Sequence, residues 1–396
     1  MERKVLITKI HNRIVTSSLE DDKLVDIQCS QEPAGKVCYS LGDIYIGKVK
    51  NIVPNIHAAF IEIAPGVECY YAIEQNKNTI FTHKIGKKPL CIGDEVLVQI
   101  SKEAVKTKVP TVTGNLNFTG RYAVLTVGNN RIGISSKITS VMRTTLQEIM
   151  KPYKSKSYGF IVRTNAQSIT PEELIQEVEE LIELYHHILT IAPSRTCYSC
   201  LQNAPSPYIT GLKNLYKTGL TQILIEDSAI YQEVYQFLSE HQPEDVDKLT
   251  LYQDKLLPLH KRYSVEQVLT DALKEHVWLK SGGYLVIQPT EALTVIDVNT
   301  GKCIGKKDNN TYLNINIEAA KEVAIQLRLR NISGIIVIDF INLDKDEDMK
   351  QLLQVLSDAI KKDPIPTTFV DVTKLQLVEL TRKKVRKPLL ESYKSV

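Results

Sequence analysis

Two stretches of the chain, "LTVIDVNTG" (293–301) and "IIVIDFINL" (335–343), follow the same plan. Each opens with branched aliphatic residues and then places an aspartate, Asp297 or Asp339, after them. Short aliphatic runs of this kind predict strands buried in a largely parallel sheet. A strand that ends in an acid brings a carboxylate to the carboxyl edge of the sheet, where open α/β sheets commonly carry their reactive groups. The two acids therefore indicate a functional site at that edge.

The segments next to these strands predict an α/β layer. A helical pattern at 316–330, for which Asn316 is the expected N-cap, lies between the two strands, and another follows at 346–364. The second pattern begins with acids and ends with lysines, as the helix dipole favours. Residues 264–283 read as one more helix that ends at glycine. Helices and strands that alternate at this spacing predict a sheet covered by helices.

Asp297, Asn299 and Asp339 form the candidate chemical site. Residues i and i+2 of a strand share a face, so Asn299 is expected to point the same way as Asp297. If the two strands are neighbours, two carboxylates and an amide oxygen converge, which is a donor set that Mg²⁺ accepts. The ion could activate water and neutralise charge that develops on phosphorus. The alternative is structural: Asp297 caps a turn, and Asp339 pairs with Arg328 or Arg330.

The N-terminal part of the chain reads as a succession of short strands. Residues 4–30, 43–73 and 95–104 alternate apolar and polar residues, and glycine and proline punctuate them. Several short strands within about a hundred residues are typical of a small closed barrel such as an OB-fold.

Aromatic residues and lysines lie together in this strand-rich part. Phe60 lies on a β-like stretch, and Tyr70 and Tyr71 follow ten residues later. Lys48, Lys50 and Lys108 are near them in the sequence. Aromatic faces among cations bind single-stranded nucleic acid, because bases stack on the rings while phosphates pair with the lysines. The alternative is that these aromatic side chains fill the core of the barrel.

The bulk properties fit a multidomain globular protein. A chain of 396 residues exceeds one ordinary domain, and its 43% hydrophobic and 24% charged residues are typical of globular proteins. The net charge of +3 does not by itself indicate a nucleic-acid partner. The segment 374–396 is rich in lysine and arginine, which fits either a nucleic-acid contact or a solvated helix end.

The cysteines and the apolar runs indicate the compartment. Seven scattered cysteines fit reduced thiols better than a disulfide framework. Cys197 and Cys200 form a lone Cys-x-x-Cys pair, whereas zinc sites usually need a second pair. No run approaches the roughly 20 apolar residues of a membrane span, and "MERKVLITKI" has no signal-peptide core. We expect a cytoplasmic protein without a membrane span.

The quoted strands belong to a longer recognisable block. "EALTVIDVNTG" (291–301) followed by "NIEAAKEVAIQLRLRNISGIIVIDFINL" (316–343) closely resembles the catalytic segment of the ribonuclease E/G family. "DIYIGKVKNIVPNIHAAFIEI" (43–63) resembles the family's S-one type OB-fold, and "QILIED" (222–227) its RNase H-like region. "TGRYAVLTV", "RIGISSKI" and "GFIVRT", between residues 119 and 164, resemble its 5′-end sensor. The resemblance therefore extends over most of the chain.

The resemblance implies an α/β multidomain fold. An RNase H-like subdomain (1–35 and 209–273) would be split by an S-one-like OB-fold RNA-binding domain (36–115) and a 5′-sensor subdomain (116–208). A DNase I-like α/β catalytic subdomain would follow at 274–396.

The resemblance also implies an activity. Family members are Mg²⁺-dependent endoribonucleases that cut single-stranded, often A/U-rich RNA and leave a 5′-phosphate and a 3′-hydroxyl. They commonly favour 5′-monophosphorylated ends and act in rRNA processing or mRNA decay. Two alternatives stay open for this chain: a non-catalytic RNA-binding or ribosome-associated protein, and a nuclease that acts on DNA.

Residue roles carry over by position. Asp297 and Asp339 match the metal-holding aspartates, and Asn299 matches the amide that supports them. The positions that match RNA-contacting residues of the OB-fold are Phe60, Tyr70 and Lys108. The positions that match the 5′-phosphate sensor are Gly120, Val124, Arg163 and Thr164.

The chain also departs from the family pattern. The Cys-x-x-Cys zinc link that usually follows the catalytic subdomain has no counterpart, so we expect no zinc link, although a homodimer through other contacts is possible. Ser136 stands where many relatives have arginine, so we expect a weaker 5′-phosphate sensor.

Overall fold

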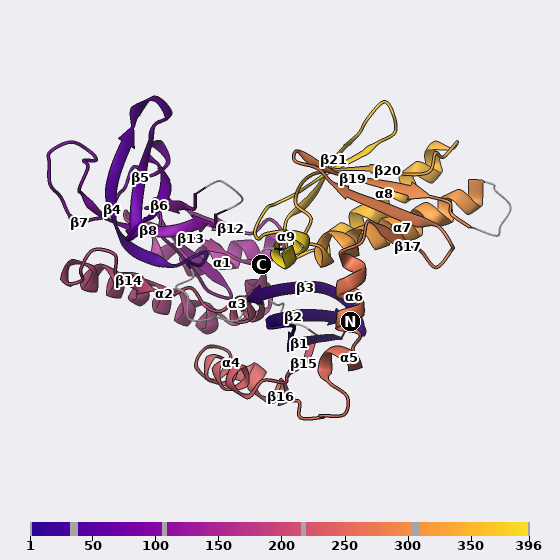
Figure 1. Cartoon of the computed structure of the whole chain (residues 1–396), viewed down its shortest axis with the longest axis horizontal. Coiled ribbons are helices and arrows are strands. Elements are labelled where there is room, and N and C mark those ends of the chain that lie inside the picture. Colours follow the sequence, from indigo (N-terminus) through magenta and orange to yellow (C-terminus); the bar gives the residue numbers. More distant parts are fainter. Residues whose placement is uncertain (1, 32–38, 105–108, 215–218, 303–308, 395–396) are drawn as a thin grey trace. The chain divides into compact units, whose positions relative to one another are not determined.

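The chain folds into two compact α/β units (Figure 1). The computed structural model describes residues 2–31, 39–104, 109–214, 219–302 and 309–394. Unit 1 comprises Met1–Ala34, Pro207–Gly211 and Tyr216–Val396, and unit 2 comprises Gly35–Ser206 and Leu212–Leu215. Unit 2 is thus an insertion between the first strands of unit 1 and the rest of it.

Unit 1 begins with a five-stranded sheet of order β16-β15-β1-β2-β3. Its members are β1 (Arg3–Ile10), β2 (Arg13–Glu20), β3 (Lys23–Gln31), β15 (Leu220–Ile225) and β16 (Leu249–Leu251). The first three strands form an antiparallel meander, and β15 joins β1 in parallel across the insertion. The helices of this region are α3 (Pro207–Asn214), α4 (Ser228–His241), α5 (Leu259–Arg262), α6 (Val265–Ala272) and α9 (Leu389–Lys394).

The second sheet of unit 1 carries the two predicted acids, and its order is β17-β18-β19-β20-β22-β21. Its members are β17 (His276–Trp278), β18 (Tyr284–Pro289), β19 (Leu293–Asn299), β20 (Gly334–Asp339), β21 (Thr367–Val372) and β22 (Val378–Arg382). Among its described strands, only β19 and β20 pair in parallel. One face packs on α7 (Asn309–Leu329) and α8 (Asp346–Ile360), because alternate residues such as Ile296 and Ile338 join leucines of these helices in one core.

Two predicted helix boundaries in this region are wrong. The helix expected at 264–283 ends at Ala272, and His276–Trp278 forms an edge strand paired with β18. A β-branched residue between two rings suits a strand, and pairing with β18 outweighs the local helical pattern. Helix α7 begins at Asn309, so Asn316 lies within it and is not its cap.

Unit 2 contains the closed barrel that the sequence predicted. Strand β4 pairs with both β5 and β8, and the ring closes through β6 and β9. The five members are β4 (Ile44–Val53), β5 (Ala58–Ala64), β6 (Val67–Ala72), β8 (Glu95–Lys102) and β9 (Thr111–Thr113). Gly47 permits close packing across the barrel, since a Cβ there would lie 2.4 Å from Ile61 Cγ2. Five strands closed in this way are consistent with an OB-like fold. The strands predicted within residues 4–30 form β1–β3, which belong to the sheet of unit 1 and not to the barrel.

A four-stranded sheet completes unit 2, in the order β10-β11-β13-β12. Its strands are β10 (Asn117–Thr119), β11 (Ala123–Val127), β12 (Ile132–Ile134) and β13 (Tyr158–Val162), and its helices are α1 (Ser140–Met150) and α2 (Pro171–Ile191). A capping box formed by Thr170 and Glu173 begins α2, as its sequence indicates. Strands β7 (Phe81–His83) and β14 (Cys200–Gln202) extend the barrel sheet.

The described helices were also compared with what a membrane-spanning helix requires. Among the residues that the structure describes, none of the helices combines the length and the apolar composition that a bilayer crossing requires.

Candidate functional site

Asp297 and Asp339 lie side by side at the carboxyl ends of two parallel strands. They are register partners in the β19–β20 pair, so their backbones are about 4.8 Å apart, the usual spacing of neighbouring strands. Both side chains are exposed, while Ile296 and Ile338, the residues before them, are buried under the helices. Strand alternation therefore turns the two carboxylates together toward the open face of the sheet.

Two asparagines form hydrogen bonds next to this carboxylate pair, one to Asp297 and one to the segment after Asp339. Asn299 Nδ2 donates to Asp297 Oδ2 at 2.8 Å, which fixes one carboxylate oxygen. Asn316 is fully buried in α7 and binds the backbone of Ile341 twice, since its Nδ2 donates to the carbonyl at 2.7 Å and its Oδ1 accepts the N–H at 3.1 Å. Asn316 thereby anchors the segment that follows Asp339.

The structural alternative for the acids is wrong. Arg328 donates to both carboxylate oxygens of Glu20 at 3.0 and 3.1 Å, and Arg330 donates to Gln326 and to the carbonyl of Lys274. Among the described residues, Asp339 has no hydrogen-bonding or ionic partner, and Asp297 has only Asn299. The carboxylate oxygens are therefore available to a ligand.

The donor atoms at this edge are of the kind that a hard cation prefers, but they are too few to complete its coordination shell. Two carboxylates and an amide are oxygen donors of the kind that Mg²⁺ accepts, and such ions usually complete their shell with water and substrate oxygens. Within the described ranges, no group of three or more His, Cys, Asp or Glu side chains gathers that could enclose a metal ion. The pair therefore fits an open site that a substrate helps to complete.

Phe60 and Tyr70 lie together on the barrel surface. They are register partners on β5 and β6, their ring centroids are 6.3 Å apart at 80°, and both side chains are half-exposed. The alternative that they fill the core is wrong for these two and correct for Tyr71, which is fully buried and hydrogen-bonded to Thr79. Lys108, the third predicted RNA contact, lies outside the described residues.

Glu62 ties several residues of unit 2 together. It accepts hydrogen bonds from the Tyr198 hydroxyl and from the N–H of Gly66 at 3.0 Å, and it pairs with Lys50 at 3.1 Å. These contacts, the tyrosine first, lower the pKa of Glu62 to about 2. Lys50 is therefore committed to a carboxylate, which reduces its availability to a phosphate.

Three of the four residues predicted to sense a 5′-phosphate lie near one another. Arg163 Nη1 donates to the carbonyl of Gly120 at 2.7 Å, and Thr164, the next residue, shares a hydrogen bond of 2.8 Å with Ser135. Val124 is half-buried on β11, where it pairs with Ile161. Arg163 and Thr164 thus bring a guanidinium and a hydroxyl to one end of the sheet.

Sequence reasoning missed Glu177 in this region. Its half-buried carboxylate accepts the N–H groups of Arg121, Tyr122 and Ala123 at 2.7, 2.7 and 2.8 Å. Burial raises the pKa of Glu177, against the opposing effect of these hydrogen bonds and of Arg163. A signal was present in the sequence, because Glu177 falls within the helical stripe of buried apolar residues formed by Leu174, Val178 and Leu181.

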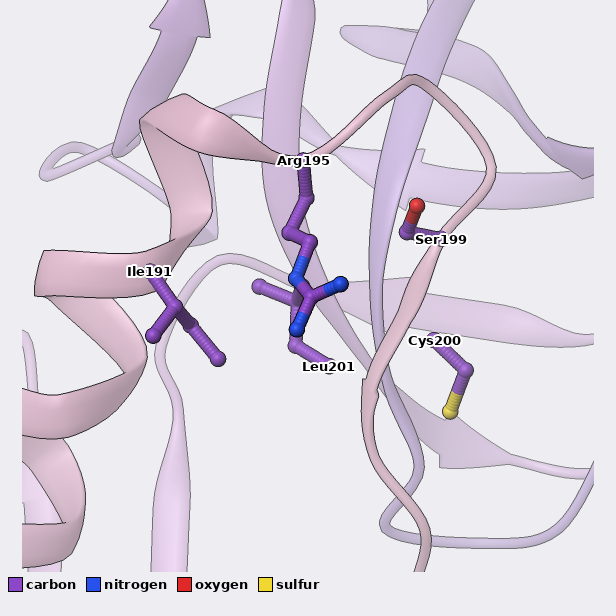
Figure 2. Close-up of a pocket in the computed structure, with 5 residues that line it drawn as sticks. All are labelled: Ile191, Arg195, Ser199, Cys200 and Leu201. Carbon is purple, nitrogen blue, oxygen red and sulfur yellow. The ribbon is translucent and has the colours of Figure 1, made fainter.

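The Cys-x-x-Cys pair, Cys197 and Cys200, brackets Tyr198, the residue that donates to Glu62. A pocket beside the end of α2 is lined by Ile191, Arg195, Ser199, Cys200 and Leu201 (Figure 2). Its volume is about 280 Å³. Cys197 and Cys200 are free thiols, and Cys200 Sγ donates to Gln202 and Asn203. Burial raises the pKa of the Cys200 thiol, which favours the protonated, weakly reactive form.

Known proteins resemble this chain over most of its length. The model of the Ribonuclease E/G family matches residues 117–385, which include both aspartates and the four residues predicted to sense a 5′-phosphate. The chain belongs to the ribonuclease E/G family. Ribonuclease G of Haemophilus influenzae is 35% identical over 361 residues, which cover 88% of this chain and 73% of that protein.

Two further relatives support the membership. Ribonuclease G of Escherichia coli K12 is 31% identical over 364 residues, covering 88% of this chain and 74% of the relative. Ribonuclease E of Nostoc sp. PCC 7120 is 31% identical over 412 residues, covering 99% of this chain and 57% of the relative. The family resemblance thus includes the barrel that precedes the matched region of the family model.

Proposed function

We propose that this chain is a Mg²⁺-dependent endoribonuclease that cuts single-stranded RNA and leaves a 5′-phosphate and a 3′-hydroxyl. The proposal extends to a preference for A/U-rich RNA with 5′-monophosphorylated ends and to a role in rRNA processing or mRNA decay, as in the family. The observation that carries it is the pairing of Asp297 with Asp339 on an open sheet face. Membership of a ribonuclease family supports the same reaction class.

Asp297 and Asp339 would hold the divalent ion, and Asn299 would keep Asp297 oriented through its hydrogen bond. When bound, the ion supplies a Lewis acid for water activation and charge neutralisation at the scissile phosphate. A 3′-hydroxyl product requires an external water as nucleophile, because attack by the RNA's own 2′-hydroxyl would leave the phosphate on the 3′ side. Asn316 keeps the residues after Asp339 in place for this chemistry.

Unit 2 would hold the RNA strand. Phe60 and Tyr70 present half-exposed rings on neighbouring strands, which suits unstacked bases and excludes a duplex whose bases stay paired. Lys108 is proposed to add a cation beside them.

We further propose that Gly120, Val124, Arg163 and Thr164 form the site for the 5′-phosphate. Arg163 and Thr164 offer a planar guanidinium and a hydroxyl, both good donors to phosphate oxygens. The Glu177 carboxylate already accepts the three N–H groups after Gly120, so the phosphate would depend on these side chains. Ser136 in place of arginine removes one further cation from this site.

The subdomain assignment is part of the proposal. Residues 1–35 and 209–273 would form the RNase H-like part, 36–115 the RNA-binding OB-fold, 116–208 the 5′-sensor, and 274–396 the DNase I-like catalytic part. The closed barrel within 36–115 supports the second of these.

The test compares two aspartate variants. Asp297→Asn should keep RNA binding and reduce cleavage of a 5′-monophosphorylated oligonucleotide by at least about a thousand-fold, because the carboxylate that holds the ion is lost. Asp358→Asn is the matched control, since Asp358 is exposed on α8, which covers the opposite face of the sheet. Both variants are assayed on gels with Mg²⁺ and with EDTA.

Each outcome of this assay separates the alternatives. Wild-type cleavage by Asp297→Asn would overturn the metal assignment. Metal-independent binding without products, by the wild-type chain, would favour a non-catalytic RNA-binding protein. Equal cutting of single-stranded DNA would favour a DNA nuclease.

A further inference from the structure

Three aromatic residues lie on the same open sheet face as the carboxylate pair. Strand register places His276 opposite Val286, Val286 opposite Asp297, and Asp297 opposite Asp339. The next row along the strands runs from Trp278 through Tyr284 to Asn299. Because paired residues share a face, both rows point the same way. Trp278 is thus two strands, about 10 Å, from Asn299.

The three rings form one cluster on this face. The centroids of Trp278 and Tyr284 are 5.1 Å apart, and those of His276 and Tyr284 are 5.6 Å apart. Val277 and Leu279, the alternate residues of the same segment, pack into the core, so the rings are not required there. Trp278 is 64% exposed on an edge strand, which leaves its ring available to a ligand.

Two exposed lysines, Lys280 and Lys302, belong to the turns next to this cluster, and the N–H of Lys280 donates to Glu318 at 2.7 Å. The N–H of Lys302 donates to the carbonyl of Gly282 at 3.1 Å, which brings Lys302 beside the turn that follows Trp278. Gly301 allows this approach, because its φ is +55° and a Cβ there would lie 2.3 Å from the Gly282 oxygen. Rings next to lysines offer a base a stacking surface and its phosphate a counter-charge.

We propose that Trp278 and Tyr284, with His276, stack a base of single-stranded RNA close to the phosphate that Asp297 and Asp339 position. The inference rests on the proposed nuclease function and adds a base contact in unit 1 to the aromatic pair of the barrel. The rings and the two aspartates lie in adjoining rows of one sheet face. The ligand of the rings is therefore expected to be the same RNA that the aspartates cut. These rings would hold the substrate strand on the catalytic sheet itself.

Trp278 provides a direct readout, because it is the only tryptophan of the chain. The wild-type protein in EDTA is titrated with a labelled single-stranded oligonucleotide, and anisotropy of the label is followed together with tryptophan fluorescence. We expect saturable quenching that follows the anisotropy. An oligonucleotide with one abasic site at the contacted position should bind about ten-fold more weakly, in line with the loss of one base stack.

Variants separate stacking from a structural role. Trp278→Ala should bind intact RNA about ten-fold more weakly and become insensitive to the abasic site, whereas Trp278→Phe should restore most of the affinity and the sensitivity. Tyr235→Ala, an exposed aromatic of α4, is the matched control and should bind as the wild type does. A Trp278→Ala variant that still discriminates the abasic position would overturn the inference.

The experiment distinguishes this inference from the proposed function. RNA binding and cleavage without any change in tryptophan fluorescence would overturn the stacking role and leave the nuclease intact. Quenching that depends on protein concentration without RNA would assign the cluster to contacts between copies and overturn the role as well. Absence of both binding and cleavage would refute the nuclease proposal itself.

Discussion

Asn316 links the helix layer to the segment that follows β20. Replacing it with alanine removes two hydrogen bonds and leaves the half-buried backbone groups of Ile341 without these partners. We expect Asn316→Ala to lower the free energy of unfolding by about 1–3 kcal/mol. Chemical denaturation measures this change, and Asn314→Ala, an exposed asparagine of the same helix, is the control.

The same variant should also lose activity beyond its loss of stability. The segment after Asp339 is no longer anchored, so kcat should fall about ten-fold or more at a temperature where the variant is fully folded. Unchanged kcat in a folded Asn316→Ala protein would show that Ile341 holds its place without this contact.

Glu62 predicts a dependence of stability on pH. Its pKa is lowered from about 4.5 to about 2 in the folded protein, mainly by the Tyr198 hydroxyl. A carboxylate with a lowered folded pKa stabilises the fold above its unfolded pKa, and this contribution is lost as the pH falls from about 4.5 toward 2. Glu62→Gln lacks this ionisation, so its melting temperature should fall less than that of the wild type between about pH 6 and pH 3.

A neighbouring residue provides the control for this measurement. Glu68 is exposed and directly opposite Glu62 in the β5–β6 pair. Glu68→Gln should follow the wild-type profile of melting temperature against pH. Parallel profiles for Glu62→Gln and the wild type would mean that the hydrogen bonds of Glu62 contribute nothing to folding.

At the level of elements, a buried ion pair connects α8, β21 and β22. Arg382 Nε donates to Asp363 at 2.7 Å, and both side chains are almost fully buried. Asp363→Asn leaves the guanidinium without its counter-charge, so we expect a loss of about 3–5 kcal/mol in the free energy of unfolding. Asp358→Asn, which breaks an exposed pair with Lys361, should leave stability close to that of the wild type. Denaturant titrations of both variants test the contrast.

The element boundaries show where sequence reasoning reaches its limit. The aliphatic runs before Asp297 and Asp339 predicted β19 and β20 well, because buried strands have few other ways to satisfy such a pattern. The segment His276–Trp278 was misread as helix, since only its pairing with β18 makes it a strand. Tertiary pairing of this kind has no local signature, so the aromatic cluster beside the carboxylates could not be found from the sequence.

The carboxylate pair also shows what the sequence alone does not reveal. The sequence identified both acids, but their register could come only from the structure. Glu177 is the opposite case: a carboxylate within an apolar helical stripe was visible in the sequence, and its three backbone partners were not.

At the scale of the whole molecule, unit 2 has the features of an autonomous insertion. Among the described residues, two hydrophobic cores are built from residues of unit 2 alone, and one of them joins the barrel to the four-stranded sheet. The segments that enter and leave it are tied together, because β14 pairs with β4 and Asp43 accepts the N–H of Ala204 at 2.7 Å. The first and last segments of unit 2 are therefore joined to each other by hydrogen bonds.

We expect a fragment of residues 39–206 to fold alone, because these cores and this closure are retained in it. It should unfold in one cooperative thermal transition and bind single-stranded RNA through Phe60 and Tyr70. It should cut no RNA, since Asp297 and Asp339 are in unit 1. Circular dichroism, anisotropy of labelled RNA and gel assays measure the three properties.

The fragment also tests how binding and chemistry are divided between the units. Phe60→Ala in the fragment should weaken RNA binding about ten-fold, as loss of a base stack predicts. Cleavage by the fragment would move the active site out of unit 1 and overturn the role of the aspartate pair. A folded fragment that does not bind RNA would instead assign the main RNA contacts to unit 1, where Trp278 and the carboxylates share one sheet face. RNA binding by the fragment would therefore show that unit 2 binds the RNA independently of the aspartates that cut it.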